Sequence, residues 1–188
     1  MRVIGGALAV IVACGFAVGY AFWPAPPARG PMQIGGDFAL IHESGDWLDT
    51  AQAFAGRPLL LYFGYTYCPD VCPTTLLDMV TASEATNADE ALIFVSVDPA
   101  RDTAAELKAY TDMFSPDLHG FTGSAAQIEA VKADWAIYSA RHDTDEFSDY
   151  LLDHTTLVFL TDEEHQVVEV FRNGTSPTAI ATSINARF

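Results

Sequence analysis

The fold can be read outward from one stretch, Leu59-Leu60-Leu61-Tyr62-Phe63-Gly64-Tyr65-Thr66-Tyr67-Cys68-Pro69-Asp70-Val71-Cys72-Pro73. Its first five residues form a short apolar run entered through Pro58, which predicts a buried strand. Pro73 fits the first turn of a helix, because the N–H that proline lacks has no partner there. We therefore expect a helix from about Thr74 to Thr86. The chain passes from strand to helix across two cysteines.

The spacing of Cys68 and Cys72 predicts a reactive or metal-binding pair rather than a stabilising disulfide. Four residues correspond to about one helical turn, so both sulfurs lie on one face. Backbone N–H groups and the positive end of the helix dipole lower the pKa of a thiol at this position. A disulfide between residues so close encloses a tiny loop and constrains the unfolded chain little. Two such thiolates can close as a redox-active disulfide or hold a soft metal.

The overall charge excludes two classes of partner. The 188 residues include 25 acidic and 9 basic side chains, for a formal net charge of −16. No basic patch is visible, so nucleic-acid binding and adhesion to anionic lipid are not expected. The acidity keeps an exported domain soluble, or it steers the domain toward a basic partner or a cation.

The N-terminus predicts a membrane anchor. Val3 to Trp23 contain no charged residue, and a helix of that length crosses a hydrocarbon core of about 30 Å. Arg2 precedes it, so the positive-inside rule places the N-terminus in the cytoplasm. A cleaved signal peptide is the rival interpretation, but the prolines in Ala25–Ala28 make a poor cleavage site. Cys14 lies inside this run and is interpreted as a small membrane-embedded hydrophobe.

The chain thus divides into residues 1–31, an anchor with a proline-rich spacer, and residues 32–188, an exported domain long enough for one core. Apolar runs predict further strands at 91–97, 138–141, 155–160 and 167–171, with a leading hairpin over 38–47. Helices are expected over about 102–114, 124–135 and from Ser176 on, and a helical turn over 49–54. This order describes an α/β fold, a mixed sheet flanked by helices. With a dithiol ending the first central strand, the pattern is thioredoxin-like.

Among the five histidines, His154 is the candidate that completes a site. It follows Asp153 and immediately precedes the strand expected at 155–160, and functional groups gather at strand ends in open α/β sheets. His165 lies in a turn with Glu163 and Glu164, where an exposed surface position is expected. No sequence pattern marks the other three histidines as site residues: His42, His119 and His142.

Two thiolates and one imidazole form a soft donor set that suits copper(I), and the same donors also hold copper(II). Structural zinc requires a fourth protein ligand, which the sequence does not obviously supply. Asp98 and Asp153 are either weak or outer ligands or polar residues that end strands. Asp70 either tunes the thiols, meets a partner or is merely exposed.

Three ordered motifs resemble the SCO/SenC family of copper-binding cytochrome oxidase assembly proteins. They are Phe63–Pro73, Val97–Thr103 and Asp153–Thr155, and the similarity extends from about Ile34 to the C-terminal helix. The resemblance implies a thioredoxin-like fold on one membrane anchor, with the folded domain on the periplasmic side of the inner membrane. It implies copper bound by Cys68, Cys72 and His154. It also implies that the copper goes to the dinuclear copper centre of cytochrome c oxidase subunit II, with another exported cuproprotein as the other possible client.

Two enzyme classes compete with this metal carrier. A tethered thiol–disulfide oxidoreductase would use Cys68 and Cys72 as its redox pair, since they lie within disulfide reach. Such enzymes usually carry CxxC with a proline opposite the dithiol, whereas this chain has CxxxC, with His154 in that place. A peroxidase would need a threonine and an arginine at one reactive cysteine, with Thr66 and Arg101 as candidates. In every case an upstream thiol reductant or copper donor is implied.

Overall fold

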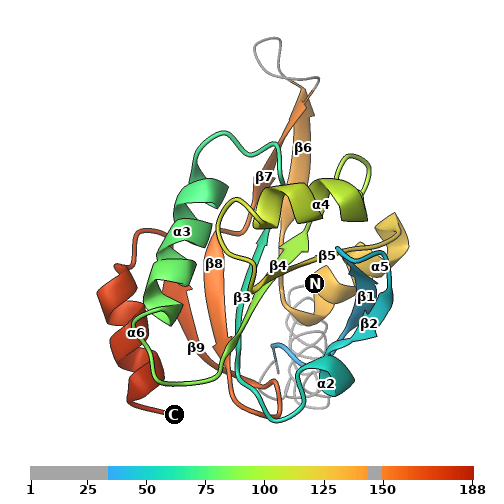
Figure 1. Ribbon diagram of the computed structural model, residues 1–188. Coiled ribbons are helices and arrows are strands. Elements are labelled where there is room, and N and C mark those ends of the chain that lie inside the picture. The colour runs from blue at the N-terminus through green and yellow to red at the C-terminus, as the bar shows by residue number, and fades with distance from the viewer. Residues whose placement is uncertain (1–33, 144–149) are drawn as a thin grey trace, which may run out of the picture. The chain divides into compact units, whose positions relative to one another are not determined.

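The computed structural model describes residues 34–143 and 150–188, and Figure 1 shows their arrangement. Seven strands form one mixed sheet in the order β2-β1-β5-β4-β3-β8-β9. Their bounds are β1 Ala39–His42, β2 Trp47–Asp49, β3 Leu59–Gly64, β4 Ala91–Ser96, β5 Leu118–Thr122, β8 Leu157–Thr161 and β9 Val167–Arg172. The helices are α2 Thr50–Ala53, α3 Val71–Ser83, α4 Ala104–Thr111, α5 Ala125–Asp134 and α6 Pro177–Asn185.

The dithiol lies at the end of the sheet where the central parallel strands finish. Strands β3, β4 and β5 run parallel, and β8 pairs with β3 in the antiparallel direction. All six residues of β3 and all six of β4 are buried. Because the strands run parallel, the carboxyl ends of β3 and β4 lie at the same sheet edge. The segments that follow them, with the cysteines after β3 and Asp98 to Asp102 after β4, therefore meet there.

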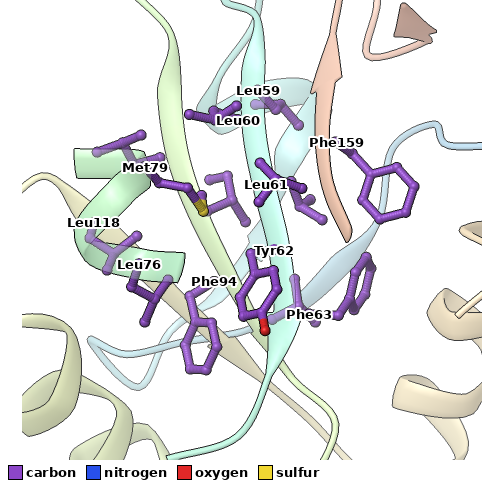
Figure 2. Close-up of a cluster of buried hydrophobic side chains, with 14 of the residues drawn as sticks. Leu59, Leu60, Leu61, Tyr62, Phe63, Leu76, Met79, Phe94, Leu118 and Phe159 are labelled. Carbon is purple, nitrogen blue, oxygen red and sulfur yellow. The ribbon is translucent and has the colours of Figure 1, made fainter. Parts of the chain in front are cut away.

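Strand β3 separates two halves of the core because its side chains alternate between the two faces of the sheet. Tyr62 stacks on Phe94, with ring centroids 6.4 Å apart, on the face that α3 and α4 cover. Phe63 points to the other face, where its ring contacts Trp135 at the end of α5 and Phe159. Figure 2 shows these two clusters on opposite sides of the strand. The predicted α/β sheet with helices on both faces is thus confirmed.

Strands β6 (Ser139–Asp143) and β7 (Tyr150–His154) form a separate two-stranded ribbon. They pair antiparallel with each other and with no strand of the large sheet. In Figure 1 the ribbon projects from the domain beside α3 and α4. The sequence predicted a strand near β6 but not β7. His154 ends β7, whereas we had expected it at the start of the next strand, which begins later, at Leu157.

Two other elements differ from the prediction. Helix α3 begins at Val71 rather than Thr74 and ends at Ser83, so Cys72 lies inside its first turn and Pro73 follows within that turn. Strand β5 was not predicted at all. The helices expected near 102–114, 124–135 and after Ser176 form as α4, α5 and α6, and their N-cap residues are Thr103, Ser124 and Ser176.

The predicted anchor, Val3 to Trp23, lies outside the described residues, as does Cys14. Within residues 34–143 and 150–188, no helix has both the length and the apolar character needed to span a bilayer.

Candidate metal centre

Three predicted donor residues converge on one point. One sulfur or nitrogen atom from each of Cys68, Cys72 and His154 lies within 4.8 Å of the others. Cys68 precedes α3 in the loop after β3, Cys72 is the second residue of α3, and His154 ends β7. Both cysteines are free thiols. In the part of the chain that the structure describes, this is the one group of three or more cysteine, histidine or acidic side chains that could share a metal.

The sheet supplies a close-fitting seat for Cys72, which is fully buried. A Cβ at Gly64 would lie 2.8 Å from the Cys72 Sγ and 2.9 Å from the Phe94 ring, so only glycine leaves room for the sulfur there. The Tyr62 hydroxyl donates to the same sulfur across 3.7 Å. The position of Cys72 is therefore set by the sheet core beneath it.

The two thiols have opposite electrostatic environments. A hydrogen bond from the Cys72 side chain is the main cause that lowers the pKa of Cys68 to about 4, and burial opposes it. His154 and the backbone N–H of Cys72, 3.4 Å from the Cys68 Sγ, lower the pKa further. Burial raises the pKa of Cys72, and the adjacent Cys68 raises it again. The metal-free site therefore holds one thiolate at Cys68 and one thiol at Cys72.

The hydrogen bonds of His154 fix the nitrogen that faces the sulfurs. Its Nδ1 lies 2.9 Å from the carbonyl oxygen of Thr155. A carbonyl only accepts, so Nδ1 carries a proton, and Nε2 is the ring nitrogen that faces the sulfurs. That Nε2 lies 3.4 Å from the Cys72 Sγ. The rings of Tyr62 and Tyr65 pack edge-on against the imidazole, with centroids 6.0 Å and 5.7 Å away.

This geometry fits a bound metal. A first-row metal about 2.0 Å from an imidazole nitrogen and about 2.3 Å from a thiolate sulfur separates those two atoms by roughly 3.5 Å at a tetrahedral angle. The observed distance of 3.4 Å between His154 Nε2 and Cys72 Sγ needs almost no adjustment. The hydrogen bond from Nδ1 to Thr155 also orients the imidazole. In metal-ligating histidines the ring nitrogen that does not bind the metal usually makes such a bond.

Cys68 lies at the inner end of an open cleft of about 270 Å³ between the α3 start and the ribbon. Only 9% of Cys68 is exposed, and Cys72 is not exposed at all. The rest of the lining is largely apolar and comes from Tyr65, Pro69, Asp70, Val71, His142, Leu151, Leu152, Asp153, His154 and Thr156. A partner approaching through this cleft meets Cys68 before Cys72.

The acidic residues considered as further ligands have other roles. Both oxygens of Asp98 are engaged, one by the Tyr150 hydroxyl at 2.7 Å and the other by Arg101 at 2.5 Å. Asp153 is exposed and lies 3.5 Å from the His142 ring. Asp70 is exposed, and although it precedes α3 its side chain makes no capping hydrogen bond.

The two residues suggested for peroxidase chemistry also bind groups other than Cys68. The backbone N–H and the hydroxyl of Thr66 both donate to the Asp102 carboxylate, at 3.1 Å and 2.6 Å. Arg101 binds Asp98 and the carbonyl of Tyr150. The arrangement therefore gives no support to a peroxidase site at Cys68.

The expectation for His165 was wrong. Its side chain is almost fully buried rather than exposed, and its Nδ1 lies 2.5 Å from the Asp37 carboxylate. The backbone at His165 has a φ of 59°, in the left-handed region that residues other than glycine rarely adopt. The segment that carries Gly36 then covers it, with the Gly36 N–H donating to the His165 carbonyl.

His42 and His119 form a second histidine contact that the sequence did not suggest. The Ser44 N–H donates to His42 Nδ1, so the proton lies on His42 Nε2, which donates to His119 Nδ1 across 3.3 Å. Burial lowers the pKa of both imidazoles. His119 lies near the amino end of β5, and so at the sheet edge opposite the cysteines.

Comparison with known proteins finds a matching family and several relatives. The SCO1/SenC family model matches residues 26–188. Protein SenC of Rhodobacter capsulatus is 39% identical over 156 residues, which cover 81% of this chain and 69% of that protein. The mitochondrial SCO1 homolog 1 of Arabidopsis thaliana is 36% identical over 149 residues, covering 77% of this chain and 44% of that one. The chain spans about half the length of the mitochondrial relatives that it matches.

Solved structures show the same fold. The Arabidopsis thaliana ScoI structure with copper bound superposes with a TM-score of 0.77 at 31% identity, over 81% of this chain and 96% of that one. The copper-bound ScoI of Bradyrhizobium japonicum gives a TM-score of 0.73 at 35% identity, over 82% of this chain and 99% of that one.

Proposed function

The chain belongs to the SCO1/SenC family, and from that premise we propose that it is a copper carrier whose metal is held by Cys68, Cys72 and His154. One observation carries the proposal. Donor atoms from two segments that are far apart in the sequence lie within 4.8 Å of one another. The relatives of known structure that contain copper support the choice of metal.

The donor set itself favours copper over zinc. Thiolates are soft ligands that select copper(I), and an imidazole beside them also accommodates copper(II). A closed structural zinc site has four protein ligands, and the described residues supply three in the cluster. A three-ligand site beside a cleft leaves one side of the metal for a ligand from a partner. That is the arrangement a carrier needs.

Transfer follows from the difference between the two cysteines. Cys68 borders the cleft and is the thiolate, whereas Cys72 is enclosed by Gly64, Phe94 and Tyr62. An incoming ligand therefore displaces Cys68 or His154 first and Cys72 last. Loading reverses this order and requires both thiols to be reduced, so an upstream reductant and a copper donor act before this protein.

Proteins of the SCO/SenC family act in copper handling and cytochrome c oxidase assembly. We therefore infer that the client is the dinuclear copper centre of oxidase subunit II or another exported cuproprotein. The charge-free run from Val3 to Trp23 supports a single-pass anchor in the inner membrane, with residues 32–188 on the periplasmic side. The tether raises the effective concentration of the domain beside membrane-embedded clients.

The test is metal loading of the reduced full-length protein in detergent. We expect one copper per chain and intense thiolate-to-copper(II) absorption after oxidation of the metal. His154→Ala should lose most of that absorption with an unchanged thiol titre. His142→Ala is the matched control, because His142 lines the same cleft outside the donor cluster. Copper affinity that is undiminished in His154→Ala would contradict the proposed ligand set.

A thiol–disulfide reductase is the second candidate, and the low pKa of Cys68 favours it. A thiolate at Cys68 could attack a client disulfide, and Cys72 would then resolve the mixed disulfide. The client gains two thiols while Cys68 and Cys72 become a disulfide. Catalytic reduction of a disulfide substrate by metal-free protein, abolished in Cys72→Ser and retained in His154→Ala, would establish this activity.

A further inference from the structure

The ribbon that carries His154 needs an anchor, because β7 pairs only with β6. Tyr150, Leu152 and His154 alternate along β7 and so lie on one face of the strand. Besides His154, whose ring packs against Tyr62 and Tyr65, the other two residues also contact the body of the domain. The Leu152 N–H donates to the Tyr65 hydroxyl at 3.2 Å. Tyr150 makes a denser set of contacts.

Tyr150 is held by an ion pair in the loop after β4. The Arg101 Nε lies 2.5 Å from Asp98 Oδ2, and the Tyr150 hydroxyl donates to Asp98 Oδ1 at 2.7 Å. The Arg101 guanidinium also donates to the Tyr150 carbonyl at 3.0 Å and lies 3.6 Å from the centre of its ring. The side chain of Asp98 is 4% exposed and that of Arg101 16% exposed. Water therefore screens these charges weakly.

The same loop holds the cysteine side of the site. The Arg101 guanidinium lies 4.7 Å from the centre of the ring of Tyr67, the residue before Cys68. Asp102 binds both the N–H and the hydroxyl of Thr66. The Ser96 hydroxyl, from the end of β4, donates to the same carboxylate at 2.5 Å. The loop from Asp98 to Asp102 thus contacts both segments that bring donor atoms to the metal cluster.

We propose that Arg101 and Asp98 are positioning residues that hold His154 over the dithiol by fixing Tyr150 on the ribbon. The proposal rests on the copper-carrier function proposed above. Its physical basis is geometric. Tyr150 is the first residue of β7 and His154 is the last. A tilt of the ribbon at Tyr150 therefore also moves the imidazole of His154. Loss of the ion pair then weakens the histidine bond to copper while both thiolates stay in place.

The test separates positioning from general stability by combining variants. Arg101→Met should weaken copper affinity about 10- to 100-fold, the usual cost of removing a partner behind a metal ligand. In a His154→Ala background the same substitution should cost no further affinity, because the ligand through which Arg101 acts is gone. A merely structural role would lower affinity in both backgrounds alike, and that result would overturn the proposal.

Arg57→Met is the matched control. Arg57 also pairs with an aspartate, Asp89 at 3.1 Å, and its guanidinium also lies over an aromatic ring, that of Phe54. It precedes β3, however, and so lies at the sheet edge opposite the cysteines. Copper affinity in Arg57→Met should equal that of the wild type.

Tyr150→Phe keeps the test decisive if Arg101→Met does not fold. It retains the ring under Arg101 and removes only the hydroxyl that donates to Asp98. We expect a smaller loss of copper affinity than in Arg101→Met, together with an altered thiolate-to-copper(II) absorption band. In the His154→Ala background Tyr150→Phe should cause neither change. A wild-type affinity and band in Tyr150→Phe would overturn the proposal. Wild-type protein that binds no copper would instead overturn the proposed function, and with it this inference.

Discussion

Cys72 lies in the first turn of a helix that packs on a seven-stranded sheet, whereas His154 ends a ribbon that pairs with no strand of that sheet. The sulfur is enclosed by Gly64, Phe94 and Tyr62 and has almost no freedom to move. The imidazole is held by hydrogen bonds and ring contacts alone. The proposed site thus joins a sulfur fixed by core packing, that of Cys72, to an imidazole that depends on a few contacts. This division suits a carrier, which must hold a metal and also release it.

The largest contrast between the two regions should appear in stability. Phe63→Ala removes a fully buried ring that packs on Trp135 and Phe159 on the face of the sheet opposite α3. We expect a loss of about 3–5 kcal/mol in the free energy of unfolding, measured by urea denaturation. Tyr138→Ala truncates an aromatic ring of similar size just before the ribbon, where 64% of it is exposed, and should cost within about 0.5 kcal/mol. Equal losses would remove the distinction between a packed block and a lightly held ribbon.

A methyl group at Gly64 should disturb the cysteine segment selectively. In Gly64→Ala the new Cβ meets the Cys72 Sγ at 2.8 Å and the Phe94 ring at 2.9 Å. Overpacking of this kind costs about 1–3 kcal/mol, so the free energy of unfolding should fall by that amount. Cys72 should also become reactive toward a thiol reagent in the folded protein. A variant with wild-type stability and an unreactive Cys72 would show that the seat of the sulfur is looser than the structure indicates.

The reactivity of Cys68 should depend more on the cysteine segment than on the ribbon. Its pKa of about 4 lies below the ordinary thiol value of 9.0, so the thiolate persists down to about pH 4. Alkylation of Cys68 should therefore be nearly independent of pH above about 5 and should slow as the pH falls through 4. Because the Cys72 hydrogen bond is the larger cause, Cys72→Ala should raise the pKa of Cys68 more than His154→Ala does. The reverse order would contradict the assignment.

The smallest effect is expected at the contact between Tyr65 and the ribbon. Tyr65→Phe removes the hydroxyl that accepts from the Leu152 N–H and should cost about 0.5–1.5 kcal/mol. Hydrogen exchange should report it locally. Protection of the Leu152 amide should decrease, while the amides of the buried strand β4 should stay as protected as in the wild type. A uniform decrease across both would indicate global destabilisation instead.

The sequence was most informative where one local signal dominates. The apolar runs that form β3 and β4 have the length and composition of buried strands, and both lie close to where they were predicted. Strand β5 was missed because Leu118-His119-Gly120-Phe121-Thr122 carries a histidine and a glycine that weaken the strand pattern. Its pairing with β4 and β1, which is non-local, provides the burial that the local sequence does not reveal.

The sequence singled out the three residues that lie together in the fold, but not the contacts that hold them there. The spacing of the cysteines and the motif Asp153–Thr155 single out Cys68, Cys72 and His154. No spacing rule connects Arg101 with Tyr150, which lie 49 residues apart along the chain. Likewise, the acidic neighbours of His165 suggested exposure, whereas its positive φ and the contact with Asp37 bury it. Long-range contacts of this kind appear only in the folded chain.

X-ray absorption spectroscopy of the copper(I)-loaded full-length protein tests the central claim most directly. The account predicts two sulfur ligands at about 2.3 Å and one nitrogen ligand at about 2.0 Å, with the nitrogen lost in His154→Ala and retained in His142→Ala. A spectrum with two sulfurs and no nitrogen in the wild type, or an identical spectrum in His154→Ala, would contradict it.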